Sequence, residues 1–155
     1  MAKKLVLDYE EEAEYSVIGI SSQLPDYRLI FYVNKVLNMH FKRIDPFFLT
    51  QKNESYSMYL YEDDANFCSL YFLSNRSNGI HLFNEFSIMD YLIFIRGDFP
   101  DDFLQSLISS LKSIQYIQIS NVLNTGKVKN YYNTIFDFEN HIQNVKTNKK
   151  DVPQP

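Results

Sequence analysis

The sequence predicts an α+β fold: a mainly antiparallel sheet of about six strands with two helices on one face, ferredoxin-like with extra strands. Two observations lead to this prediction. Residues 89–95 are apolar at every position except Asp90, counting tyrosine as apolar, which is typical of a central strand buried on both faces. Residues 24–29 resemble residues 99–104, and each run follows an expected strand and opens an expected helix. Two strand–helix–strand halves around a central hairpin are the basis of a ferredoxin-like sandwich.

The first part of the chain contains three expected strands and one expected helix. The strands are expected at residues 4–9, 15–21 and 41–44, and the second has a glycine inside it. Pro25 suits the first turn of the helix, because its φ is fixed near the helical value and no N–H is needed there. The apolar residues that follow at helical spacing are expected to face the core: Leu29, Ile30, Val33, Val36 and Leu37.

The middle of the chain predicts a hairpin that precedes the central strand. Asp45-Pro46 is expected to end the preceding strand, and residues 47–55 are expected to form a loop. Residues 56–61 alternate in polarity, and an acidic turn separates them from residues 67–73, so the two runs are expected to pair as antiparallel strands. Residues 74–79 carry a strong turn signal.

The last part of the chain completes the second half of the fold. Pro100 is expected near the start of a second helix, and residues 114–122 are expected to form the last main strand. Residues 131–142 fit either a short strand or a helix. We expect one domain over residues 1–145 and a disordered tail over residues 146–155, because the tail is polar and contains prolines.

The composition limits the class of protein. The chain has 155 residues, which is enough for one domain that holds a core without metals or disulfides. Cys68 is the single cysteine, so neither a disulfide nor a cysteine-based zinc site can form within the chain. The first residues do not resemble a secretion signal, and no apolar stretch approaches the roughly 18 residues of a membrane-spanning helix. We therefore expect a cytoplasmic protein without a membrane partner.

The charge and the aromatic content bear on nucleic-acid binding. The net charge of −4 argues against it, because general nucleic-acid binding needs a basic surface. The 12 tyrosines and 13 phenylalanines could supply a stacking surface for bases or ring-bearing ligands. Codon bias in an AT-rich genome would produce the same composition, and we favour that explanation.

Two carboxylates, Glu85 and Asp90, lie just before the central strand enters the core. Together they could serve acid–base chemistry or hold a divalent cation. The structural alternative is that Asp90 fixes a turn or caps the strand, while Glu85 pairs with Arg76 or Arg96. We favour this alternative, because the spacing is not that of a known calcium loop and no third carboxylate is near in the sequence.

Two further segments have groups that can bind anions. Residues 74–79, which include Asn75 and Arg76, could hold an anion through backbone N–H groups with help from Arg76. Ser21 and Ser22 precede the first helix, where hydroxyl and N–H groups either cap the helix or bind anions. The first segment lacks the form of a P-loop, so a turn is the simpler interpretation, and capping is the commoner role for the serines.

The remaining reactive side chains do not suggest a site. The three histidines, His40, His81 and His141, have no metal-ligand spacing. Cys68 lies in an expected strand, where a cysteine is usually a small core residue. We therefore predict no catalytic residue, no metal and no cofactor.

Five runs of the sequence share the pattern of a known group of proteins: 4–8, 18–22, 26–29, 73–76 and 83–91. Together they resemble the IPExxxVDY family of uncharacterised bacterial proteins. In the last run, Glu85, Asp90 and Tyr91 match the naming motif. The departures are Phe83 for Ile, Asn84 for Pro and Met89 for Val.

The resemblance covers residues 4–122 and implies no activity, substrate or cofactor. It singles out residues of the matching runs as functional candidates: Glu85, Asp90, Tyr91, Asp26, Tyr27, Arg28, Asn75 and Arg76.

The leading functional hypothesis is a non-catalytic cytoplasmic module or adaptor that binds a protein partner, because no convincing catalytic constellation is present. A homodimer through a sheet edge is a related expectation, since an open sheet must protect its edges. One alternative is a small enzyme or ligand sensor that uses Glu85 and Asp90, with Arg28 or Arg96 contacting an anion. A second alternative is an RNA-associated protein whose aromatic side chains stack on bases.

Overall fold

The computed structural model describes residues 14–151, so the strand expected at residues 4–9 lies outside the described part. The chain divides into two compact units. One is Tyr15–Lys127, and the other contains helix α4 (Tyr131–Asp151). The prediction of one domain over residues 1–145 stays a prediction.

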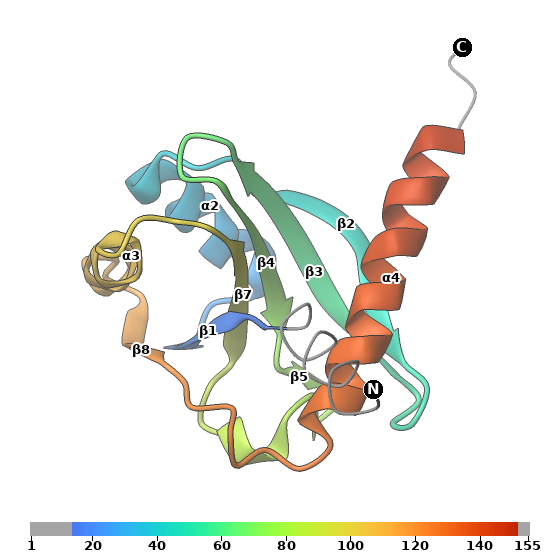
Figure 1. Ribbon diagram of the computed structural model, residues 1–155. Coiled ribbons are helices and arrows are strands. Elements are labelled where there is room, and N and C mark those ends of the chain that lie inside the picture. Colours follow the sequence, from blue (N-terminus) through green and yellow to red (C-terminus); the bar gives the residue numbers. More distant parts are fainter. Residues whose placement is uncertain (1–13, 152–155) are drawn as a thin grey trace. The chain divides into compact units, whose positions relative to one another are not determined.

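The larger unit is built on a six-stranded sheet in the order β2-β3-β4-β7-β1-β8 (Figure 1). The strands are β1 (Ser16–Ser22), β2 (Lys42–Leu49), β3 (Glu54–Asp63), β4 (Cys68–Ser74), β7 (Tyr91–Gly97) and β8 (Ile117–Val122). Every neighbouring pair is antiparallel. Strands β8-β1-β7-β4 lie in the ferredoxin-like order, with α2 after β1 and α3 between β7 and β8, and β2 and β3 extend the sheet beyond β4. The predicted fold class is confirmed.

Helices α2 (Asp26–Leu37) and α3 (Phe103–Lys112) lie on the same face of this sheet (Figure 1). Their apolar sides join a buried cluster with alternate residues of the central strands. In β7, Ile93 and Ile95 belong to this cluster, whereas Leu92 and Phe94 point to the opposite face and are buried as well. The prediction that residues 89–95 form a central strand is therefore confirmed, with the strand beginning at Tyr91.

Strand β2 shows where the sequence interpretation was wrong. The strand continues through Asp45-Pro46 to Leu49, so the expected loop over residues 47–55 begins only after it. The pairing register with β3 shifts between Ile44 and Phe47, which accommodates the proline in a bulge on an edge strand. Phe47 is consequently buried instead of lying in a loop. Val36, which was expected in the core, is 47% exposed.

The segment before β7 folds into small local elements. The turn expected at residues 74–79 is a short hairpin of β5 (Arg76–Ser77) and β6 (Ile80–His81). A 3-10 turn, η1 (Asn84–Phe86), follows it. Together these elements lead the chain from the end of β4 to the start of β7.

The ambiguous run over residues 131–142 is helical and belongs to α4. Residues 146–151, expected in a disordered tail, continue this helix, and residues 152–155 lie outside the described part. Within residues 14–151, no helix has the length and apolar character needed to cross a membrane.

Candidate functional site

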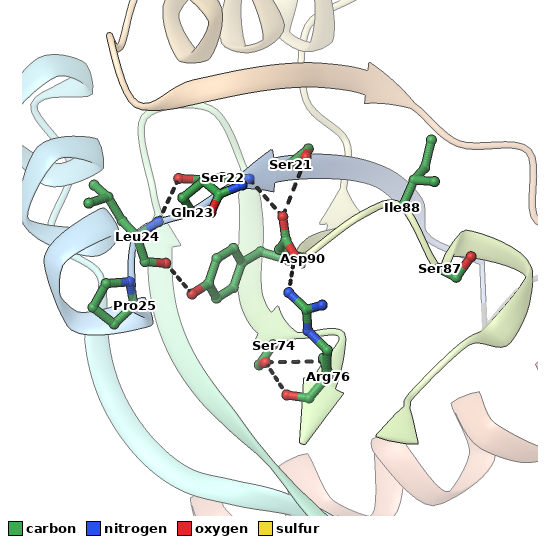
Figure 2. A pocket seen from close by; sticks show the side chains of 11 residues that line it. Ser21, Ser22, Gln23, Leu24, Pro25, Ser74, Arg76, Ser87, Ile88 and Asp90 are labelled. Carbon is green, nitrogen blue, oxygen red and sulfur yellow. Dashed lines mark hydrogen bonds and ion pairs between the residues drawn. The ribbon is translucent and has the colours of Figure 1, made fainter. Parts of the chain in front are cut away.

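A cavity of about 710 Å³ opens in the larger unit where three separate segments meet (Figure 2). The first is the end of β1 with its link to α2, the second is the end of β4 with β5, and the third leads into β7. The lining residues are Ser21, Ser22, Gln23, Leu24, Pro25, Ser74, Arg76, Ser87, Ile88, Asp90 and Tyr91. This volume is within the range of small-molecule sites.

Asp90 is the centre of the cavity wall (Figure 2). Its Oδ2 accepts a hydrogen bond from the Ser22 backbone N–H at 2.9 Å and from the Ser21 hydroxyl at 3.4 Å. Its Oδ1 accepts a charge-assisted hydrogen bond from Nη2 of Arg76. The Asp90 carboxylate therefore joins β1 to the β4–β5 segment and holds the Arg76 guanidinium beside the cavity.

Asn75 fixes the segment behind the cavity. Its side chain is fully buried and uses both of its N–H donors and one of the two lone pairs of its oxygen. Nδ2 donates to the carbonyls of Phe86 at 2.9 Å and Met89 at 3.0 Å, and Oδ1 accepts from the Phe83 N–H at 3.0 Å. The backbone N–H of Asn75 also donates to the Asp90 carbonyl at 2.9 Å. One side chain thus sets the path of residues 83–90 into β7.

Tyr91 forms a second part of the wall. Its hydroxyl donates to the Leu24 carbonyl at 2.6 Å, which fixes the β1–α2 link. Its ring stacks on Phe72 with centroids 5.1 Å apart. Burial, followed by the negative charges of Asp26 and Asp90, raises the pKa of the Tyr91 hydroxyl. Tyr91 is therefore neutral at ordinary pH and acts as a positioning donor.

The serines of the cavity are mostly structural. The Ser22 hydroxyl donates to the Tyr116 carbonyl at 2.7 Å and accepts from the Leu24 N–H at 3.3 Å. The Ser74 hydroxyl donates to the Arg76 carbonyl at 2.7 Å, which supports the start of β5. Ser87 is exposed at the opposite side of the cavity (Figure 2). The two segments that suggested anion binding, residues 74–79 and Ser21-Ser22, face each other across Asp90.

The structure does not bring Glu85 and Asp90 together in this cavity. Glu85 is exposed on η1 and does not line it. Its negative charge acts on Lys52, whose pKa is lowered by burial and raised to a lesser extent by Glu85. Arg96, one of the expected anion contacts, lies at the other end of β7 with its guanidinium carbon 5.7 Å from the centroid of the Tyr15 ring.

A second region is formed by residues of α2 that point away from the core. We call this the α2 outer face, and define it as the exposed residues Tyr27, Arg28, Phe31 and Lys35. Tyr27 is 64% exposed and Phe31 is 60% exposed. Tyr27, Arg28, Phe31 and Tyr32 line a shallow hollow of about 410 Å³. The family resemblance singled out Tyr27 and Arg28, but the sequence interpretation did not include Phe31, although it is four residues after Tyr27 on the same face of the helix.

Asp26, the remaining candidate, lies at the start of α2 between the two regions. Its Oδ1 accepts from the Tyr27 N–H at 2.8 Å, and its Oδ2 accepts from the Tyr59 hydroxyl at 3.1 Å. This carboxylate connects the first turn of α2 to β3 and lines neither hollow. Its role in the structure is to hold the helix start.

Metal and nucleophile chemistry find little support among the described side chains. Within that part of the chain, no group of three or more His, Cys, Asp or Glu residues could hold a metal ion. Burial, with smaller contributions from Asp63 and Glu62, raises the pKa of the Cys68 thiol to about 12. A thiol with this pKa is protonated and unreactive at neutral pH.

Comparisons with known proteins add no family or relative to this description. No family model matches the chain, and a search of curated proteins gives no match.

Proposed function

We propose that the chain is a non-catalytic module that binds a protein partner through the α2 outer face. The observation that supports this proposal is the pair of exposed rings, Tyr27 and Phe31, at positions i and i+4 of one helix. Exposed aromatic residues that lie together mark interaction surfaces more often than single exposed residues do. Tyrosine and arginine are also the residue types that most often dominate the energy of protein interfaces.

The helix presents these rings rigidly. Leu29, Ile30 and Val33 anchor its inner side in the core, and all three are at most 5% exposed. Tyr32 packs on Tyr116 with ring centroids 5.0 Å apart, which holds the edge of the hollow in place. A rigid aromatic surface loses little conformational freedom on binding, so more of the contact energy is retained as affinity.

The charge of the surface indicates the kind of partner. Arg28 and Lys35 are exposed beside the rings, although the chain as a whole carries a net charge of −4. The Lys35 ammonium lies 6.0 Å from the centroid of the Phe31 ring. The partner segment that complements this surface has an apolar or aromatic anchor residue flanked by carboxylates.

The non-catalytic part of the proposal is supported by the bonding of the cavity. The Asp90 carboxylate accepts three hydrogen bonds, and the Tyr91 hydroxyl donates to a backbone carbonyl. Neither group is poised to exchange a proton with a substrate. A reducing, cytoplasmic location is part of the same proposal, and the single free cysteine is compatible with it. Membership of the IPExxxVDY family likewise remains a proposal.

The experiment is site-specific photo-crosslinking. A photoreactive phenylalanine is placed at Phe31 and, as a matched control, at Phe67, which is 70% exposed in the turn before β4 and follows Asp63 and Asp64. We expect a protein crosslink from position 31 that is absent from position 67. Because the partner segment is acidic, Arg28→Glu together with Lys35→Glu should abolish the crosslink.

Three outcomes would overturn this proposal. Equal crosslinking from both positions would mean that the α2 outer face is not specific. A crosslink that disappears with nuclease would assign the face to RNA. A crosslink between two copies of the chain would make the module a homo-oligomer. The homodimer expected through a sheet edge is a poor alternative to a dimer through α2, because the bulge of β2 and its exposed Lys42 and Arg43 oppose strand pairing.

A further inference from the structure

The cavity around Arg76 is separate from the protein-binding proposal and has its own chemistry. Eleven residues line it, and most contribute polar groups (Figure 2). One of them, Arg76, is a cation, and one, Asp90, is an anion. A ligand that fills this cavity must form hydrogen bonds with these polar groups, so it is a polar molecule.

Arg76 is the group in this wall that is prepared to bind a ligand. Its side chain is 53% exposed, whereas that of Asp90 is 20% exposed. Asp90 contacts the guanidinium through Nη2, and a guanidinium carries five N–H donors in a fixed planar arrangement. Within residues 14–151, the contact with Asp90 uses one of the two N–H groups on Nη2, so the other edge of the guanidinium keeps two parallel donors for a ligand. The ion pair also prevents the long side chain from moving freely, which reduces the entropy lost on binding.

The planar donors of Arg76 match a carboxylate. Guanidinium and carboxylate groups form paired, parallel hydrogen bonds, which give both energy and orientation. A monoanion fits better than a dianion, because Arg76 is the one cation among the lining residues and already shares its charge with Asp90, so a second negative charge on the ligand has no counter-charge there. The other walls offer the Ser87 hydroxyl, the Gln23 amide and the Ser21 hydroxyl, which suit a ligand with hydroxyl groups.

We propose that this cavity binds a small hydroxylated monocarboxylate, such as a sugar acid, with the carboxylate on Arg76. Asp90 is a positioning residue that holds the guanidinium, and the exposed Ile88 covers the carbon chain of the ligand. This proposal does not depend on the protein-binding role of α2.

The test measures binding of gluconate to the full chain by calorimetry, with sorbitol as the uncharged analogue and inorganic phosphate as the dianion. We expect saturable binding of gluconate at millimolar concentration, weaker binding of phosphate and no binding of sorbitol. Removing the charged hydrogen bonds with Arg76→Gln should weaken gluconate binding roughly tenfold or more. Arg43→Gln is the matched control, because it removes an exposed arginine of β2 outside the cavity, and it should bind gluconate as the wild type does.

Several results would overturn the proposal. If gluconate and a panel of other hydroxy acids show no saturable binding, the cavity does not take this class of ligand. If phosphate binds more tightly than gluconate, the ligand is not a carboxylate. If Arg76→Gln melts at the wild-type temperature and still binds gluconate normally, the carboxylate does not contact Arg76. If the variant melts at a lower temperature, Arg76→Lys keeps the charge and removes the planar donors, and unchanged gluconate binding by that variant would also overturn the proposal.

Discussion

The cavity and the α2 outer face lie on either side of the Asp26 helix start, yet they are built in opposite ways. The cavity is made from segments that are far apart in the sequence: the two Asp90 contacts with β1 span 68 and 69 residues. The polar groups of its wall hold one another in place through hydrogen bonds. The α2 outer face comes from one helix of 12 residues, and its two largest exposed groups are rings.

This difference has a physical consequence. The cavity depends on the pairing of β1 with β7 and on buried hydrogen bonds, so one buried substitution should disturb the whole wall. The exposed side chains of the α2 outer face all come from one helix, so substitutions of these side chains should change binding and leave the fold unchanged. The predictions below test that contrast, beginning with the largest expected effect.

Asn75→Ala should destabilise the protein most. The substitution leaves two carbonyls and one N–H without their buried partner, and each such group costs about 1–3 kcal/mol. We expect the free energy of unfolding to fall by about 3 kcal/mol or more. Chemical denaturation measures this change, and Asn84→Ala, at an exposed asparagine of η1, is the control. Equal stability of the two variants would show that the buried hydrogen bonds do not set the path into β7.

Tyr91→Phe should have a smaller effect. It removes the hydrogen bond to the Leu24 carbonyl but keeps the ring that stacks on Phe72, so we expect a loss of about 1 kcal/mol. Tyr27→Phe removes a hydroxyl from the exposed α2 outer face and should not change stability. The two variants are compared in the same denaturation experiment. A larger loss for Tyr27→Phe would reverse the contrast between the two regions.

The pH dependence of stability should separate the same two variants. The pKa of the Tyr91 hydroxyl is raised in the folded protein, so folding favours its neutral form. The associated stability is complete below the unfolded pKa of about 10 and is lost as the pH rises above that value towards the folded pKa. Above about pH 10, the stability of wild type and of Tyr27→Phe should therefore fall more steeply with pH than the stability of Tyr91→Phe. Parallel pH profiles for all three proteins would contradict the burial of this hydroxyl.

Phe31→Ala should have the smallest effect on stability. The ring is 60% exposed and alanine is a better helix former than phenylalanine, so the change should stay within about 0.5 kcal/mol. The same denaturation series measures it. A loss comparable to that of Asn75→Ala would mean that Phe31 is part of the core and not a binding surface.

The two regions also differ in how far sequence could predict them. The helix after Pro25 was predicted from its spacing, and residue 31 lies on the side of the helix opposite to the core positions 30 and 33 together with the exposed residues 27 and 28. The same reasoning could have identified Phe31. It failed for Val36, which lies at the margin of the apolar face, whereas Leu37 in the same turn packs against the core.

The cavity could be predicted only in pieces. Asp90, Arg76 and the Ser21-Ser22 pair were each singled out, but their meeting depends on the antiparallel register that places Ile20 opposite Tyr91. No local pattern specifies that register. Arg76 was singled out in a turn segment and Asn75 in a run that carries the family resemblance, whereas the buried hydrogen bonds of Asn75 go to residues 8 to 14 positions later in the chain. The two carboxylates do not share a site, because η1 turns Glu85 outwards and away from the cavity that Asp90 lines.

The most direct test of the account compares partner capture by wild type, Phe31→Ala and Arg76→Gln, using the immobilised 155-residue chain and quantitative mass spectrometry after nuclease treatment. We predict that one set of proteins retained by the wild type is lost with Phe31→Ala and kept with Arg76→Gln. The opposite pattern, in which Arg76→Gln loses the partner and Phe31→Ala keeps it, would contradict the assignment of the protein partner to the α2 outer face.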